Sequence, residues 1–165
     1  ISKELFHRTK GYKLTRMGED IEFSIRIINE GFKTALIPDA YVYHKRRTSI
    51  SQFYKQLHFF GRARVNVNRF YPGEMKMIHL LPLAFLMAFW GWLSTLFWYY
   101  PLFQVGAIVV GWYYLAILVD ALTKYKSVKI AFISIATSFV QLYAYGMGIV
   151  SEKIQPRGNQ PFAQK

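Results

Sequence analysis

Three long apolar segments constrain the fold of this chain more than any other feature of its sequence. They cover residues 78–99, 102–122 and 128–150. Each has about 20 residues, the length at which a helix crosses a hydrocarbon core of ~30 Å. Trp and Tyr residues crowd the far end of the first segment, as aromatic side chains do at a membrane interface. The sequence therefore predicts an all-α transmembrane region of about three helices within residues 77–150.

The charged residues lie mainly before these segments. Residues 1–76 contain 15 of the 21 Lys and Arg residues and 7 of the 9 Asp and Glu residues. Lys124, Lys126 and Lys129 mark the second connection as cytoplasmic, because basic residues favour that side of a membrane. We therefore expect an integral membrane protein of a bacterial or archaeal plasma membrane, with its polar part on the cytoplasmic face. If all three segments cross, the polar tail of residues 151–165 lies outside.

The chain has a formal net charge of +12 and no cysteine. A basic chain invites a nucleic-acid interpretation, but attraction to anionic lipid headgroups accounts for the same charge. We therefore expect membrane lipids as partners and no nucleic acid. The lack of cysteine excludes thiol nucleophiles and Cys-ligated zinc.

An acidic pair follows a glycine in the stretch of residues 17–26, MGEDIEFSIR. Isoleucines recur behind the pair at helical spacing, which predicts a helix over residues 19–30. Glu19 and Asp20 then lie at the helix N-terminus, where the helix dipole favours negative charge. Two interpretations remain open from these residues alone: simple helix capping, or a general base held at the edge of a cleft.

The segments on either side of this helix predict little regular structure of their own. Residues 1–16 read as a loop or a strand remnant, and residues 32–37 and 40–44 read as two short strands around a Pro-Asp turn. Two short strands do not form a stable sheet alone, so they need strands that this chain does not contain. Because the sequence begins at Ile1 without an initiator Met, we expect a fragment of a longer polypeptide.

Residues 48–76 predict an amphipathic helix directly before the first apolar segment. Ser49 and Gln52 fit a capping box at its start. Aromatic and aliphatic side chains share one face, while Lys55, Arg62 and Arg69 repeat on another. Such a helix suits the plane of a membrane interface, and its position before a membrane segment favours this over a surface helix packed on its own domain.

Four stretches together point to a family: residues 18–26 (GEDIEFSIR), 43–49 (YHKRRTS), 56–64 (QLHFFGRAR) and 145–148 (YGMG). Their order resembles the C-terminal half of the membrane-bound family 2 glycosyltransferases, which are inverting enzymes with a GT-A nucleotide-sugar fold. The resemblance covers roughly residues 10–155 and implies that residues 1–47 are an α+β remnant of the GT-A catalytic domain. The glycines of the last stretch are expected to allow close packing of the third helix.

The resemblance also implies roles for single residues. Asp20 would be the catalytic base that takes a proton from an acceptor hydroxyl, with Glu19 supporting it or contacting the acceptor. The donor is a nucleotide sugar, and the acceptor a polyprenyl-linked or other envelope glycan. The leaving diphosphate needs cations or a metal ion, and a divalent Mg or Mn would be ligated mainly by residues outside this chain. Candidate groups for binding the donor diphosphate or the acceptor are His44, Arg46, Arg47, Gln56 and Arg62.

The sequence departs from the family pattern at two points. Processive members carry QxxRW at the interface helix, but here Phe59 follows in place of the arginine, which favours transfer of a single sugar. The Asp-x-Asp metal motif of the nucleotide-binding half is absent, so these residues alone are expected to be inactive. Two other classes remain open: a membrane-anchored basic scaffold or lipid-binding module without catalysis, and a small transporter that would use the polar stripe in the third segment.

Overall fold

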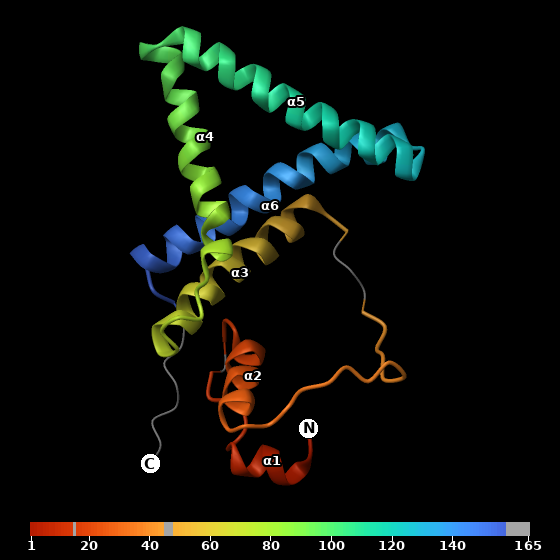
Figure 1. Ribbon diagram of the computed structural model, residues 1–165, viewed down its shortest axis with the longest axis vertical. Coiled ribbons are helices and arrows are strands. Elements are labelled where there is room, and N and C mark those ends of the chain that lie inside the picture. The colour runs from red at the N-terminus through yellow and green to blue at the C-terminus, as the bar shows by residue number, and fades with distance from the viewer. Residues whose placement is uncertain (15, 45–47, 158–165) are drawn as a thin grey trace.

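The computed structural model describes residues 1–14, 16–44 and 48–157, and the regular structure within them is helical. Two shorter helices come first, α1 (Lys3–Arg8) and α2 (Glu19–Asn29). A long helix, α3 (Ile50–Phe70), and a 3₁₀ turn, η1 (Met77–Leu80), lead to the apolar part. This part contains α4 (Leu81–Trp98), α5 (Tyr100–Tyr125) and α6 (Val128–Ile154) (Figure 1).

Three of these helical stretches are long and apolar enough to cross a membrane: Met77–Trp98, Tyr100–Tyr125 and Val128–Ile154. The three long apolar helices expected from the sequence are therefore present, and they indicate a membrane protein. Few of their large side chains are buried within the protein, as expected of residues that face lipid.

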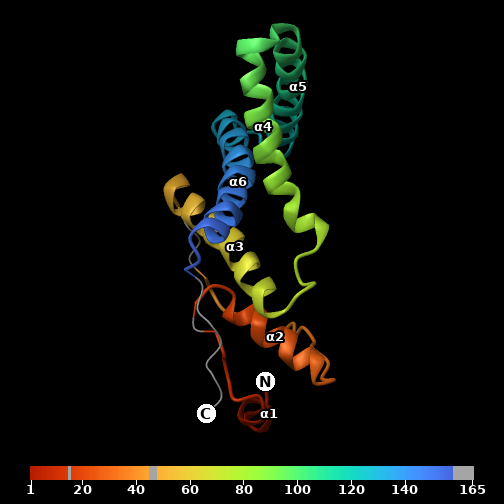
Figure 2. The ribbon, with the colours of Figure 1, turned by 90° about the vertical axis from the view of Figure 1, so that its left-hand side faces the viewer.

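The three apolar helices form the sides of a triangle (Figure 1), and α3 lies alongside α6 in both views (Figures 1 and 2). Helix α6 returns from the far end of α5 and crosses α4, and at mid-length of both helices the rings of Phe89 and Phe139 lie 5.1 Å apart in an edge-to-face contact. Further down, a Cβ atom added to Gly146 would lie only 2.6 Å from the carbonyl oxygen of Pro82. The end of α6 therefore lies beside the start of α4 and beside α3.

Glycines set the approach of α3 to α6. A Cβ atom on Gly61 would overlap the carbonyl oxygen of Tyr145, and one on Gly148 would overlap that of His58. Only glycine lets two helix backbones come this close. The prediction that the glycines of the 145–148 stretch allow close packing is confirmed.

The α+β prediction is wrong: no strand is present in the described parts of residues 1–47. Residues 32–37 and 40–44 are irregular: Phe32 N–H donates back to the carbonyl of Ile27 (3.2 Å), and between the two segments Ala40 N–H donates to the carbonyl of Ile37 (3.1 Å) in a turn. The physical reason is that each segment has no strand beside it to satisfy its backbone groups. The side chains of Leu36 and Tyr43 remain exposed as a result.

Residues 1–16, predicted as a loop or strand remnant, contain helix α1. The hydroxyl of Ser2 accepts a hydrogen bond from Leu5 N–H (3.2 Å), which caps the helix N-terminus. The helix predicted over residues 19–30 is confirmed as α2, and Ser49 caps α3 by accepting from Gln52 N–H (3.2 Å) as expected.

Candidate functional site

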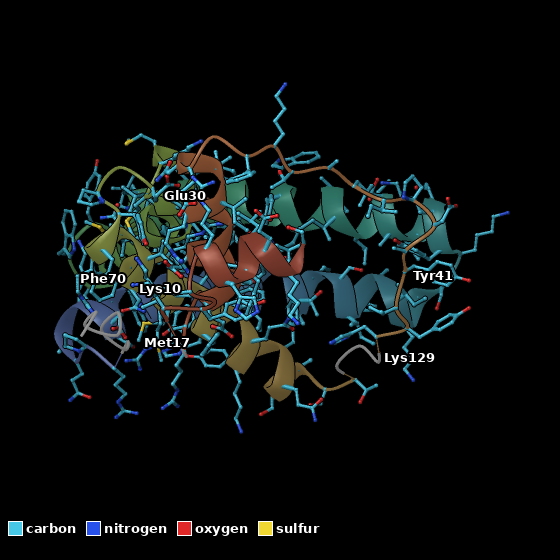
Figure 3. The ribbon with its side chains drawn as sticks, turned by 90° about the horizontal axis from the view of Figure 1, so that it is seen from below. Lys10, Met17, Glu30, Tyr41, Phe70 and Lys129 are labelled. Atoms are coloured by element: carbon cyan, nitrogen blue, oxygen red, sulfur yellow. The ribbon has the colours of Figure 1, made fainter. Side chains whose placement is uncertain are left out.

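The acidic pair is presented by a tight turn at the start of α2. Met17 and Gly18 both have positive φ angles, 61° and 96°, and Gly18 is the N-cap residue. A side chain at Gly18 would be strained by this conformation and would also meet Val67 of α3, whose methyl lies 2.6 Å from the Cβ position. The turn thus sets α2 against α3. Figure 3 shows Met17 close to α3, whereas Tyr41 of the irregular segment lies at the other end of the molecule.

The acidic pair lines a cleft of about 460 Å³ between the start of α2 and α3. Glu19 is half-buried and Asp20 is exposed. Asp20 accepts a hydrogen bond from Ile21 N–H (2.8 Å) through Oδ1, so it supports the helix start and faces the cleft at the same time. The lining residues are Tyr12, Gly18, Glu19, Asp20, Ile21, Phe59, Phe60 and Ala63.

A second cleft of about 440 Å³ adjoins the first, because Phe59 and Phe60 line both. Gln52, Lys55 and Gln56 complete it. The two phenylalanines thus separate a carboxylate-bearing cleft from one that carries amides and a cation. The first cleft therefore offers carboxylates for proton transfer, and the second cleft, beyond the two phenylalanine rings, offers hydrogen-bond donors.

A buried network supports α2 from behind. Arg26 Nε donates to Glu22 Oε1 (2.6 Å) within the helix, and the Arg26 guanidinium also donates to the carbonyls of Thr9 and Gly11. Tyr71, just after α3, donates its hydroxyl proton to Glu22 (2.7 Å). Burial by itself raises the pKa of Glu22, but the hydrogen bonds from Arg26 and Tyr71 outweigh it and hold the pKa below its ordinary value. Burial, followed by the Glu22 carboxylate, raises the pKa of Tyr71 to about 12.

Two of the three cations on this face of α3, Arg62 and Arg69, are held by a carboxylate of α6, whereas Lys55 is exposed at the second cleft. Arg62 is buried and donates to Glu152 of α6 through Nε (2.9 Å) and Nη2 (2.6 Å), and Arg69 Nη2 lies 3.4 Å from the other carboxylate oxygen. One turn earlier, His58 Nε2 lies 3.1 Å from the hydroxyl of Ser151. Burial lowers the pKa of His58, and the neighbouring Arg62 charge lowers it further.

The structure therefore brings some of the predicted site residues together and separates others. Asp20 and Glu19 line one cleft and Gln56 lines its neighbour. Arg62 points into the contact with α6, and His44 is exposed in the irregular segment, outside the lining of both clefts. Arg46 and Arg47 lie outside the described residues. Within the described residues, no group of three or more His, Asp or Glu side chains is placed to hold a metal ion.

Sequence reasoning missed the groups that hold the acidic pair in place. Glu22 and Arg26 carried a usable signal, since opposite charges four residues apart share a helix face. The contact of Asn66 with Met17 and that of Glu152 with Arg62 carried none, because each joins residues that are distant in the sequence.

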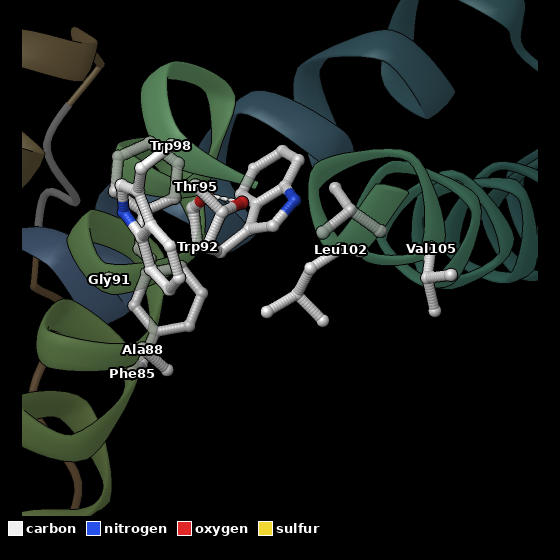
Figure 4. Close-up of a pocket in the computed structure, with 11 residues that line it drawn as sticks. Phe85, Ala88, Gly91, Trp92, Thr95, Trp98, Leu102 and Val105 are labelled. Atoms are coloured by element: carbon white, nitrogen blue, oxygen red, sulfur yellow. Dashed lines mark hydrogen bonds between the residues drawn. The ribbon is translucent and has the colours of Figure 1, made fainter. Parts of the chain in front are cut away.

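A further cavity, of about 650 Å³, lies between α4 and α5 (Figure 4). Trp92 and Trp98 of α4 face it from one side, and Leu102 and Val105 of α5 from the other. Its hydroxyl group, from Thr95, donates to the carbonyl of Trp92 within α4 (2.6 Å). This cavity offers no titratable group and is not the candidate site.

Comparisons with protein families, with curated proteins and with solved structures found no match to this chain.

Proposed function

We propose that this chain is the acceptor-activating and membrane-bound part of an inverting glycosyltransferase, in which Asp20 is the general base. One observation carries the proposal: Asp20 and Glu19 line a cleft whose opposite wall is α3, the helix that leads directly into the first membrane segment. A cleft in this position is open to an acceptor that reaches it from the lipid surface.

The chemistry required of Asp20 is modest. An acceptor hydroxyl is a weak nucleophile, and a positioned carboxylate takes its proton as the oxygen attacks the anomeric carbon. The new bond forms from the opposite face to the departing nucleoside diphosphate, so the configuration inverts. Glu19, half-buried beside Asp20, contacts the acceptor or supports the base.

The nucleotide-sugar donor is held by residues outside this chain. The expected Mg or Mn ion belongs with that donor, where it would offset the charge of the leaving diphosphate. Because the described residues offer no set of metal ligands, we assign no step to a metal here. The proposed enzyme is non-processive and acts at the cytoplasmic membrane face, and its acceptor is a polyprenyl-linked or other envelope glycan.

The test is the variant Asp20→Asn in the full-length protein. Removing a general base costs typically 10²- to 10⁴-fold in rate, so transfer should fall by at least about 100-fold while donor binding stays within about twofold. Asp39→Asn is the matched control, because Asp39 is exposed in the irregular segment and lines neither cleft. Near-normal turnover by the Asp20 variant would remove the proposed role.

A related experiment distinguishes the proposed enzyme from the non-catalytic alternative. A basic scaffold or lipid-binding module needs the two acids only for the start of α2. Replacing Glu19 and Asp20 would then lower the stability of the fold and leave vesicle binding unchanged, and wild-type protein would show no sugar transfer.

A further inference from the structure

Asn66 is a fully buried amide near the C-terminal end of α3, with no solvent exposure. Its Nδ2 donates to the main-chain carbonyl of Met17 (3.1 Å), and its Oδ1 accepts from Arg69 Nη1 (3.2 Å). The guanidinium has only donors, so the bond from Arg69 fixes which end of the amide faces Met17. Both polar ends of the side chain are therefore used, and one of them holds the chain just before the acidic pair.

The carbonyl that Asn66 holds belongs to the left-handed turn at Met17 and Gly18. A methionine rarely adopts a positive φ angle, so its conformation persists only where surrounding contacts hold it. The Met17 side chain is buried at 3% exposure, and Gly18 lies against Val67 and Ala63 of α3. Asn66 supplies the directional contact in this set, since packing alone does not fix the orientation of a carbonyl group.

The contacts continue from Asn66 to α6. Arg69, which orients the amide, also lies 3.4 Å from Glu152 Oε1, and Glu152 Oε2 binds Arg62. A continuous series of polar contacts therefore joins the last apolar helix to the turn that presents Asp20: Glu152, Arg69, Asn66, Met17.

We infer that Asn66 is a positioning residue for the acidic pair, and that its contact with Arg69 makes the place of Asp20 depend on the docking of α6 against α3. This inference rests on the proposed function, in that the group being positioned is the proposed base. Asn66 lines neither cleft, so its effect on Asp20 is exerted through the turn at Met17 and Gly18.

A merely structural role for Asn66 makes a different prediction. A buried amide that only satisfies its own hydrogen bonds would lower the overall stability when replaced. Under that role, replacing Asn66 would not increase local opening at Met17 and Gly18 more than elsewhere. The turnover number of the molecules that remain folded would also be unchanged.

Hydrogen exchange tests the positioning without reference to activity. The variants are Asn66→Asp, which removes the donor to Met17 and keeps a partner for Arg69, and Arg69→Met, which removes the link to Glu152. Amides of residues 16–23 should exchange at least about tenfold faster in both variants, since exchange reports local opening, while amides in the middle of α6 remain protected. Asn68→Ala is the matched control, because Asn68 accepts from Met75 N–H (3.1 Å) and does not bind the turn.

Kinetics of the full-length protein supply the second measurement. Asn66→Asp should lower kcat by at least about tenfold and leave the donor KM within about twofold, because the loss is confined to the acceptor side. Unchanged exchange in residues 16–23 and an unchanged kcat would overturn the inference, even if Asp20→Asn is inactive. Faster exchange with an active Asp20→Asn variant would uphold the positioning contact and reject the proposed function instead.

Discussion

Arg62 and Glu152 are 90 positions apart in the sequence, yet Arg62 Nη2 lies 2.6 Å from Glu152 Oε2 in the contact between α3 and α6. The exposed fractions of the two side chains are 9% and 0%. An ion pair this deeply buried is held in place by its partners, because either charge alone would be left in a poorly solvated site. The pair therefore joins the helix that forms one wall of the candidate cleft to the last apolar helix.

Breaking this ion pair on one side should be costly. Arg62→Ala leaves a buried carboxylate with fewer partners and is expected to destabilise the fold by about 3 kcal/mol. The double variant Arg62→Met with Glu152→Leu removes both charges. Its loss of stability should be smaller than the sum of the losses measured for Arg62→Met alone and Glu152→Leu alone. Denaturant titration of the purified protein in detergent measures these differences. Additive losses in the double variant would contradict the coupling.

The glycines at the crossing of α3 and α6 provide a second prediction. Gly148→Ala places a methyl group onto the carbonyl oxygen of His58, which is backbone and has little room to move. Overpacking of this kind costs typically about 1–3 kcal/mol, so the midpoint of unfolding should fall. Gly111→Ala is the matched control, because a Cβ atom on Gly111 of α5 meets no atom within 4 Å. The control should be neutral or slightly stabilising, since alanine favours a helix.

These two contacts show what could and could not be predicted from the sequence. Local patterns sufficed where a structure depends on near neighbours: the apolar segments, the start of α2 after Gly18, and the cap at Ser49 were all predicted. The strands at 32–37 and 40–44 failed because strand formation depends on partners that the pattern of one segment does not contain.

The candidate site shows the same division. Asp20 and Glu19 stood out because two carboxylates after a glycine are visible in the sequence. The charge of Arg62 is visible in the sequence and suggests a ligand for the diphosphate or the acceptor, whereas its partner Glu152 lies on a distant helix. The pairing of a charged group depends on tertiary packing, so the sequence indicated the charge without indicating how it is used.

Stability should depend on pH through Glu22. Its pKa in the folded protein is below the ordinary value of 4.5, so the unfolded chain binds the proton more tightly. The stabilisation is present above about pH 4.5 and is lost as the pH falls through the folded-state pKa. Burial and Arg62 also lower the pKa of His58 from 6.5. The folded protein therefore favours the neutral imidazole, and it loses stability as the pH falls below about 6.5, before Glu22 begins to contribute.

Glu22→Gln isolates the first of these contributions. The variant should be less stable than the wild type near neutral pH, because Arg26 and Tyr71 lose the carboxylate that they bind. Its denaturation midpoint should then change less than that of the wild type between about pH 5 and about pH 3. Parallel pH profiles for the two proteins would show that Glu22 does not titrate as described.

The end of α6 should lie on the same side of the membrane as α3. Three complete crossings would put the two on opposite sides, but Glu152 near the end of α6 is buried against Arg62 of α3. The ion pair and three full crossings are incompatible, so we expect one of the long helices not to cross completely.

The chain has no cysteine, which allows single cysteines to be placed at the exposed positions Ser24, Lys153 and Tyr100. A membrane-impermeant maleimide should label Ser24→Cys and Lys153→Cys from one side and Tyr100→Cys, at the junction of α4 and α5, from the other. Labelling of Lys153→Cys together with Tyr100→Cys would instead support three complete crossings and would rule out the contact between Arg62 and Glu152 in the membrane.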